Sequence, residues 1–258
     1  MSTTPRVYLL SRPVFTEASR AFLRDLLPPE EAHWAQTEGV TDAERVVEFA
    51  GRVCYMSFGR LQSGRTNAAY IHNLIRNGHD SVLEHAVWTF ALTGISRAFT
   101  HQLVRHRVGF SYSQLSQQYH DETDARFVRP TGLDDSPEAA AIWDGAIRET
   151  QNAYKKLLAR LNAMAAAPVG KEARRTLRSI ARSILPNATE TTIVVTANAR
   201  AIRHFLEVRG RVLGDSEMRI VSATLLETLR PEAPALFADF IIEHPEDQLP
   251  LVRHVALP

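Results

Sequence analysis

The sequence predicts an α+β fold in one domain. Residues 86–95 and 191–197 alternate side chains with the period of two that is typical of strands, and both are rich in β-forming residues. Most other segments carry apolar residues at helical spacing, without an internal repeat or a long linker. With 258 residues, 45% of them hydrophobic, the chain can bury a sizeable core. One α+β domain is therefore the simplest organisation.

Local signals place the elements in the first part of the chain. Thr41 and Glu44 have the spacing of a capping box at the start of a helix. Asn77 and Gly78 form a favoured helix C-terminus, and Ser96 can cap the helix that follows the first long strand. The predicted elements are a strand at 7–10, a helix from 41 to about 54, a break at the polar segment 59–64, a helix ending at 77–78, a strand at 86–95 and a helix from 97 to about 107.

Proline and serine mark the helix boundaries in the second part of the chain. Ser136 and Pro137 are typical of a helix start, with proline at the first helical position, and Pro186 ends a helix before it. The predicted elements are a short strand at 126–128, helices at 137–166 and 172–184, a strand at 191–197, helices at 200–208 and 216–229, and an apolar segment at 236–242.

Three basic residues, Arg105, His106 and Arg107, stand side by side at the predicted end of the helix that starts at residue 97. The helix dipole favours cations there, or they pair with distant carboxylates, but the dipole is worth only ~0.3–1 kcal/mol per charge and explains one cation better than three. Adjacent cations repel one another, so the triplet indicates a site for a phosphorylated ligand. In a helix, the two arginines would point to nearly opposite sides.

The segment after the triplet is rich in hydroxyl, amide and aromatic groups, and we expect an exposed loop. Such groups suit a base and a sugar, whereas the alternative is an ordinary polar surface loop. Its direct continuity with the triplet favours the binding site. The residues are Ser111, Tyr112, Ser113, Gln114, Ser116, Gln117, Gln118 and Tyr119.

Several classes of protein and site are disfavoured. A net charge of +1 argues against a general nucleic-acid binder. The lone Cys54 excludes an intrachain disulfide and a multi-cysteine metal site, and its default role is buried apolar filler. His79 and His85 match no metal-binding spacing, so we expect no metal. Without an apolar run of ~20 residues or a leader, a soluble cytoplasmic protein is expected.

Glycine-rich phosphate loops are also absent from the sequence, so a bound nucleotide or flavin would be held by arginines. Arginines recur at helical spacing in the C-terminal half. Most of them are expected to be solvated or paired, and a few converging with the triplet would form an anion pocket. They are Arg174, Arg175, Arg178, Arg182, Arg200, Arg203 and Arg209.

These residues resemble the flavin-dependent thymidylate synthase family. The family signature is an RHR triplet followed by a serine in a loop, here Arg105 to Arg107 and then Ser116. Further matches follow in order along most of the chain. They are GRVCY at 51–55, NGHDSVLEH at 77–85, HQLVRHR at 101–107, IARSILP around Arg182 and NARAIRHFLEVR at 198–209.

The resemblance implies one domain over residues 1–258, with a central, mostly antiparallel sheet flanked by helices, and a homotetramer with FAD between subunits. It implies methylation of a uracil nucleotide at C5, dUMP to dTMP, with methylenetetrahydrofolate as carbon donor and NADPH as reductant. The implied cofactor-binding residues are His85, Arg105, His106, Arg107, Asn198, Arg200 and His204. The implied substrate-binding residues are Gln102, Gln114, Ser116, Gln117, Gln118, Arg182 and Arg209.

Two of these residues carry implied catalytic roles. C5 of uracil is a weak nucleophile, so negative charge on the carbonyl oxygens of the ring must be stabilised, and the match assigns this to Arg209. Ser116 is interpreted as a hydroxyl that positions the substrate, because no general base is evident beside it in the sequence. Cys54 lies outside any nucleophile motif, and the flavin chemistry of the family needs no cysteine.

The chain departs from the family pattern at two places. Eight residues rather than seven separate the triplet from Ser116, with the extra residue near Val108 and Gly109, and Gln118 stands where the family usually has a nucleotide-binding arginine. An amide can donate to and accept from a hydroxyl but carries no charge. The alternative function is therefore a UMP-preferring or dual UMP/dUMP C5 methylase of a specialised nucleoside antibiotic pathway. An alternative from another class is a non-catalytic nucleotide- or RNA-binding protein.

Overall fold

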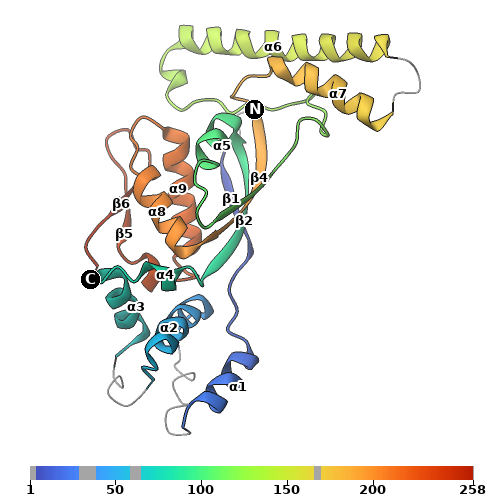
Figure 1. Cartoon of the computed structure of the whole chain (residues 1–258). Coiled ribbons are helices and arrows are strands. Elements are labelled where there is room, and N and C mark those ends of the chain that lie inside the picture. The colour runs from blue at the N-terminus through green and yellow to red at the C-terminus, as the bar shows by residue number, and fades with distance from the viewer. Residues whose placement is uncertain (1–3, 29–38, 59–64, 166–169, 258) are drawn as a thin grey trace. The chain divides into compact units, whose positions relative to one another are not determined.

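The computed structural model describes residues 4–28, 39–58, 65–165 and 170–257 (Figure 1). Helices and strands are mixed without a regular alternation, so the predicted α+β class is confirmed. The elements are β1 Arg6–Ser11, α1 Glu17–Leu26, α2 Asp42–Tyr55, α3 Asn67–Arg76, α4 Asp80–Leu83, β2 Val87–Ser96, α5 Arg97–Leu103, β3 Phe110–Gln114, α6 Pro137–Met164, α7 Lys171–Ala181, β4 Glu190–Asn198, α8 Ala199–Arg209, α9 Ser216–Leu229, β5 Phe240–Glu243 and β6 Leu251–His254, with short 3-10 helices at Leu133–Asp135, Arg182–Ile184 and Ala235–Phe237.

Four strands form the main sheet in the order β1-β2-β4-β3, and the pairing is mostly antiparallel, as expected. Both strands that the period of two predicted are present, and β2 alternates buried and partly exposed positions from Trp88 to Gly94. The hydroxyls of Thr89 and Thr196 join β2 to β4 at 2.9 Å. A second, antiparallel sheet pairs β5 with β6, with Phe240 opposite His254.

The chain forms two compact units, and each unit is built from separate segments. Unit 1 comprises Met1–Arg6, Leu92–Arg105 and Tyr112–Val194, and unit 2 comprises Val7–Ala91, His106–Ser111 and Val195–Pro258. The boundary passes through the basic triplet, between Arg105 and His106. A single domain over residues 1–258 stays a prediction.

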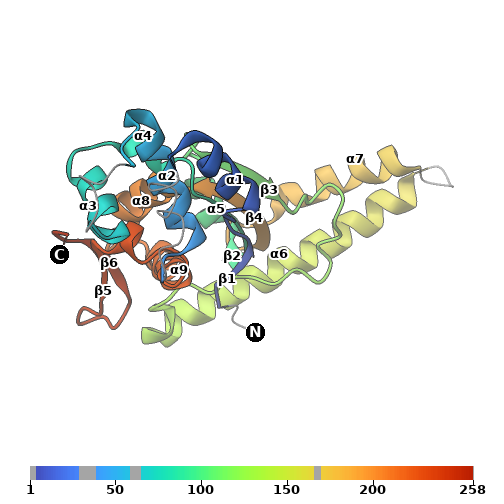
Figure 2. The ribbon, with the colours of Figure 1, turned by 90° about the horizontal axis from the view of Figure 1, so that it is seen from below.

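Each unit has an apolar core of its own. In unit 1, α6 and α7 lie side by side (Figures 1 and 2) and bury Tyr154, Leu158 and Ala181 between them. In unit 2, α8 buries Ile202, Phe205 and Leu206 through the i, i+3, i+4 spacing of its apolar residues.

Helices with a capping residue were predicted well. Oγ1 of Thr41 accepts a hydrogen bond from the backbone N of Glu44 at 3.3 Å at the start of α2. Ser136 caps α6 in the same way, with Pro137 at the first position, and α9 has the predicted bounds. The predicted break at residues 59–64 lies outside the described residues.

Other predictions were wrong. The helix that starts at Arg97 ends at Leu103 rather than near residue 107, and residues 126–128 contribute only an isolated bridge between Phe127 and Thr189. Cys54 is exposed rather than buried, because the last turn of α2 lies at the surface, where Tyr55 is 73% exposed. The predictions also missed α1, α4 and β6.

Candidate functional site

The basic triplet lies in the turn between α5 and β3. Because α5 ends before it, the expected placement of the two arginines on opposite sides of a helix was wrong. Arg105 and Arg107 are exposed and His106 is partly buried. Gly109, with φ +74°, reverses the chain direction into β3, and the neighbouring Val108 is 83% exposed. The extra residue near 108–109 thus lies in a tight turn.

His106 acts as a hydrogen-bond acceptor in this turn. Nε of Arg209 donates to Nε2 of His106 at 3.0 Å. The ring centroids of Phe205 and His204 lie 5.3 Å and 6.1 Å from that of His106. Burial, and then the neighbouring Arg209 and His204, hold the pKa of His106 below 6.5. Accepting this hydrogen bond requires an unprotonated Nε2, which agrees with the lowered pKa, and the Nε2 lone pair orients the guanidinium of Arg209.

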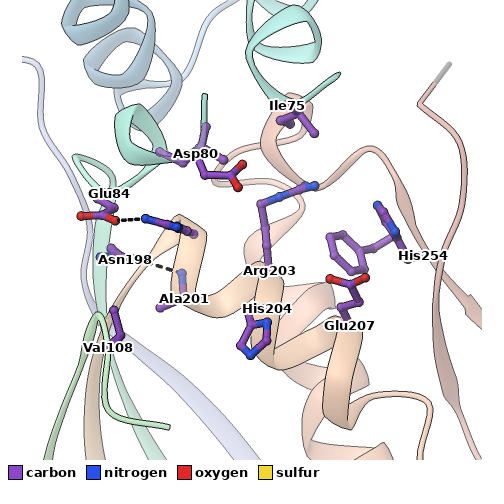
Figure 3. A pocket seen from close by; sticks show the side chains of 13 residues that line it. Ile75, Asp80, Glu84, Val108, Asn198, Ala201, Arg203, His204, Glu207 and His254 are labelled. Atoms are coloured by element: carbon purple, nitrogen blue, oxygen red, sulfur yellow. Dashed lines mark hydrogen bonds and ion pairs between the residues drawn. The ribbon is translucent and has the colours of Figure 1, made fainter. Parts of the chain in front are cut away.

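A cavity of about 480 Å³ lies beside the start of α8 in unit 2 (Figure 3). Asn198 begins the helix, since its Oδ1 accepts from the backbone N of Ala201 at 2.9 Å while its own backbone N donates to the carbonyl of Gly109 at 3.2 Å. Three predicted cofactor-binding residues, Asn198, Arg200 and His204, line this cavity together. The lining residues are Ile75, Asp80, Leu83, Glu84, Val108, Asn198, Arg200, Ala201, Arg203, His204, Glu207, Phe240 and His254.

The cavity also contains residues that the sequence did not mark. Arg200 pairs with Glu84 at 2.6 Å. Arg203 donates two hydrogen bonds of 2.6 Å to the carboxylate of Asp239, which His254 contacts at 2.9 Å. Burial would raise the pKa of Asp239, but the hydrogen bonds and charges of Arg203 and His254 hold it below its usual value. Arg203 was noted only as one of a series of arginines, and no sequence signal connects it with Asp239.

This cavity suits part of a flavin dinucleotide. The start of an 11-residue helix and the side chain of Arg200 favour anionic groups, while Asp80, Glu84 and Glu207 add carboxylates to the same wall. Ile75, Leu83 and Phe240 provide apolar surface for a planar ring. The residue types on the cavity wall therefore fit FAD.

All predicted substrate residues except Arg209 lie in unit 1. The expected exposed loop begins instead as β3, because residues 110–114 join the main sheet. On this strand, Nε2 of Gln114 donates to the hydroxyl of Thr100 at 3.0 Å. Gln102 is exposed on α5, and the Oγ of Ser116 accepts from the backbone N of Gln118 at 3.3 Å in the turn after β3.

A buried polar group lies next to this turn. Gln117 and Glu122 are only 6% and 4% exposed. Arg97 Nε, Gln117 Nε2 and Glu122 Oε1 make no hydrogen bond within 3.5 Å among the described residues. Burial raises the pKa of Glu122, while the charges of Arg97 and His120 and the nearby amide of Gln117 oppose the rise. Burial lowers the pKa of Arg97, and the charge of Arg182, a predicted substrate residue, adds to the lowering.

The candidate site residues thus fall into two sets. Unit 2 holds His85, His106, Arg107, Asn198, Arg200, His204 and Arg209. Unit 1 holds Gln102, Arg105, Gln114, Ser116, Gln117, Gln118 and Arg182. Arg209, predicted to bind substrate, is thus in the same unit as most of the cofactor-binding set. His85 is exposed just before β2 and is not among the cavity-lining residues.

In the part of the chain that the structure describes, no group of three or more His, Cys, Asp or Glu side chains is arranged to hold a metal ion. No helix in residues 4–28, 39–58, 65–165 and 170–257 is long and apolar enough to cross a membrane.

Known proteins match this chain over most of its length. The family described as thymidylate synthase complementing protein, Thy1, matches residues 37–235. A flavin-dependent thymidylate synthase of Mycobacterium avium (strain 104) is 48% identical over 223 residues, which are 84% of this chain and 87% of the relative. A protein of that name from Mycobacterium sp. (strain JLS) is 44% identical over 243 residues, 92% of this chain and 90% of the relative. The one from Mycobacterium tuberculosis (strain ATCC 25177 / H37Ra) is 46% identical over 221 residues, covering 84% and 86%.

These matches place the chain in a class of nucleotide-modifying flavoenzymes. The chain belongs to the Thy1 family of flavin-dependent thymidylate synthases, and the resemblance seen in its motifs is confirmed.

Proposed function

We propose that this chain catalyses the reductive methylation of C5 of dUMP to form dTMP, with FAD as cofactor, methylenetetrahydrofolate as carbon donor and NADPH as reductant. The observation that carries the proposal is the cavity at the start of α8, where Asn198, Arg200 and His204 meet in a chain of this family. When bound, FAD supplies the redox chemistry of the methyl transfer.

The cavity residues would hold the cofactor in distinct ways. The start of α8 and Arg200 favour the negative charge of a pyrophosphate. Glu84 holds Arg200 at 2.6 Å, which fixes the guanidinium before the ligand arrives. The ring of His204 lies on the cavity wall next to His106 and can pack against a planar group.

Arg209 is the proposed electrostatic catalyst. Its Nε is occupied by His106, and no hydrogen bond from its Nη atoms is found among the described residues. The guanidinium can thus present two fixed N–H donors to a uracil carbonyl oxygen, on which negative charge develops as C5 reacts. Neutral His106 matters here, because a protonated ring could not accept from Arg209.

UMP is the second candidate acceptor. Gln118 is uncharged, and both ends of its amide are hydrogen-bonded, to Arg175 and to Ser179. Nε2 keeps a second proton with which it can donate to a ribose hydroxyl. This observation favours a site that also accepts UMP.

A homotetramer with FAD between subunits and a cytoplasmic location complete the proposal, on the basis of the family motifs and the single cysteine. Light scattering of the purified holoprotein measures the assembly directly. A monomeric, fully active holoprotein would refute the proposed assembly.

Tritium release tests the reaction. The protein is incubated with FAD, NADPH and methylenetetrahydrofolate and with either 5-tritiated dUMP or 5-tritiated UMP. We expect yellow protein and release from dUMP, and the ratio of the two rates measures the acceptor preference. Colourless protein that takes up no FAD and releases no tritium would instead favour the non-catalytic nucleotide- or RNA-binding alternative.

A further inference from the structure

The side chain of Gln118 is held by α7. Nε of Arg175 donates to Oε1 of Gln118 at 3.1 Å, and Nε2 of Gln118 donates to the Oγ of Ser179 at 3.2 Å. Arg175 and Ser179 are four residues apart, so one face of the helix presents both groups. Since a guanidinium can only donate, the carbonyl end of the amide must face Arg175. The amide is therefore fixed in one orientation.

Basic side chains of α7 lie close to Tyr119, the residue that follows Gln118. The guanidinium of Arg175 lies 5.5 Å from the ring centroid of Tyr119, and Nζ of Lys171 lies 6.0 Å from it. Nη1 of Arg178 donates to the carbonyl oxygen of Tyr119 at 2.7 Å. Three basic side chains of one helix thus lie against the turn that begins at Ser116.

The charge of Arg175 is only weakly compensated. Its Nη1 contacts Glu172 at 3.2 Å, but the two side chains are 42% and 75% exposed, so the pair is a weak, solvent-screened one. Its Nη2 has no hydrogen-bond partner among the described residues. The Gln118 amide and the Tyr119 ring orient this guanidinium without neutralising it, which leaves N–H groups for an anion.

We propose that Arg175 binds the phosphate of the substrate nucleotide and that Gln118 is its positioning residue. The proposal rests on the proposed function, because it places the nucleotide beside Ser116. A glutamine at position 118 carries no charge, and Arg175 provides a cation at the far end of its amide. The site then still offers a cation to a phosphate, although position 118 itself is uncharged.

A purely structural role, in which Arg175 only ties α7 to the turn, predicts a different result. Loss of such a tie would weaken dUMP and deoxyuridine binding alike, because both share the base and sugar. Loss of a phosphate contact would weaken dUMP binding alone. The ratio of the two dissociation constants therefore separates the roles.

Isothermal titration of the FAD-loaded protein with dUMP and with deoxyuridine measures that ratio. For Arg175→Ala we expect dUMP affinity to fall about 10- to 100-fold, typical of a charge-assisted hydrogen bond, with deoxyuridine affinity changed less than about twofold. Arg174→Ala is the matched control, since Arg174 is an exposed neighbour on the same helix whose side chain has no hydrogen bond or ion pair within the described residues. It should leave both constants unchanged.

A swapped pair provides the second variant. Gln118→Arg combined with Arg175→Gln returns the cation to the turn and should recover the preference for dUMP over deoxyuridine, even if Arg175→Ala fails to fold. An unchanged ratio in Arg175→Ala, or a swapped pair that folds but does not prefer dUMP, would overturn the proposal. Wild-type protein that does not bind dUMP would overturn the proposed function itself.

Discussion

Substitution of Gly109 by alanine tests the turn that joins the basic triplet to the cavity. Gly109 has φ +74°, and an added Cβ would lie 2.7 Å from Cβ of Ala201 and 2.8–2.9 Å from the side-chain amide of Asn198. The left-handed backbone costs an alanine about 1–2 kcal/mol. The Cβ must also displace Asn198, and losing an N-cap costs about 0.5–2 kcal/mol. We expect the free energy of unfolding to fall by about 1.5–4 kcal/mol.

Gly78→Ala is the matched control. Gly78 has φ +68°, but nothing lies within 4 Å of its added Cβ, so only the backbone cost applies. Urea unfolding should give both variants the same slope of unfolding free energy against urea concentration. Gly109→Ala should be less stable than Gly78→Ala by about 0.5–2 kcal/mol, which is the contribution of the Asn198 cap. Because Asn198 lines the cavity, FAD uptake should weaken in Gly109→Ala alone. Equal losses of stability in the two variants would refute the packing of Gly109 against α8.

Three further predictions concern single side chains. Arg209→Ala should lower tritium release at least ~100-fold while 450 nm absorbance shows FAD retained; loss of both together would assign Arg209 to the cofactor. The pKa of His106 lies below 6.5 in the folded state, so wild-type stability should decline as pH falls below 6.5, and His106→Gln should reduce that decline in urea titrations; parallel pH profiles would count against the partly buried, neutral ring. The pKa of Glu122 is raised above 4.5, chiefly by burial, so the ionised carboxylate destabilises the folded protein as the pH rises above 4.5. Glu122→Gln should therefore gain stability relative to wild type between about pH 4 and pH 7, and a constant difference would contradict this.

The sequence predicted the elements whose boundaries depend on nearby residues. The side chains of Thr41 and Ser136 each accept a hydrogen bond from a backbone N three residues later. The cap and the start of its helix can therefore be recognised together from a short stretch of sequence. β6 is only four residues long, two of them the basic Arg253 and His254, and it exists because β5 pairs with it. The end of α5 was also missed, since no glycine or proline stands at Leu103 and the main sheet takes up the chain again at Phe110.

Residue types at the site followed from motifs, but their partners did not. Asn198, Arg200 and His204 were named from one segment, and a single helix brings them to one cavity. The pairs of Arg203 with Asp239 and of Arg175 with Gln118 join residues 36 and 57 positions apart. Such pairs depend on how elements pack, and no spacing along the chain signals them. A motif thus identifies the residues of a site better than it identifies the partners that position their side chains.

The basic triplet shows how a hydrogen-bond partner changes the interpretation of a motif. In the sequence, three adjacent basic residues that repel one another predict a bound anion. In the structure, His106 is neutral and accepts from Arg209, so only Arg105 and Arg107 of the triplet carry charge, and both are exposed, where water screens their repulsion. Repulsion within the triplet is therefore not what requires an anion. The third cation is Arg209, which His106 orients from 103 positions away, and the central residue of the motif acts by aligning an arginine that the motif does not contain.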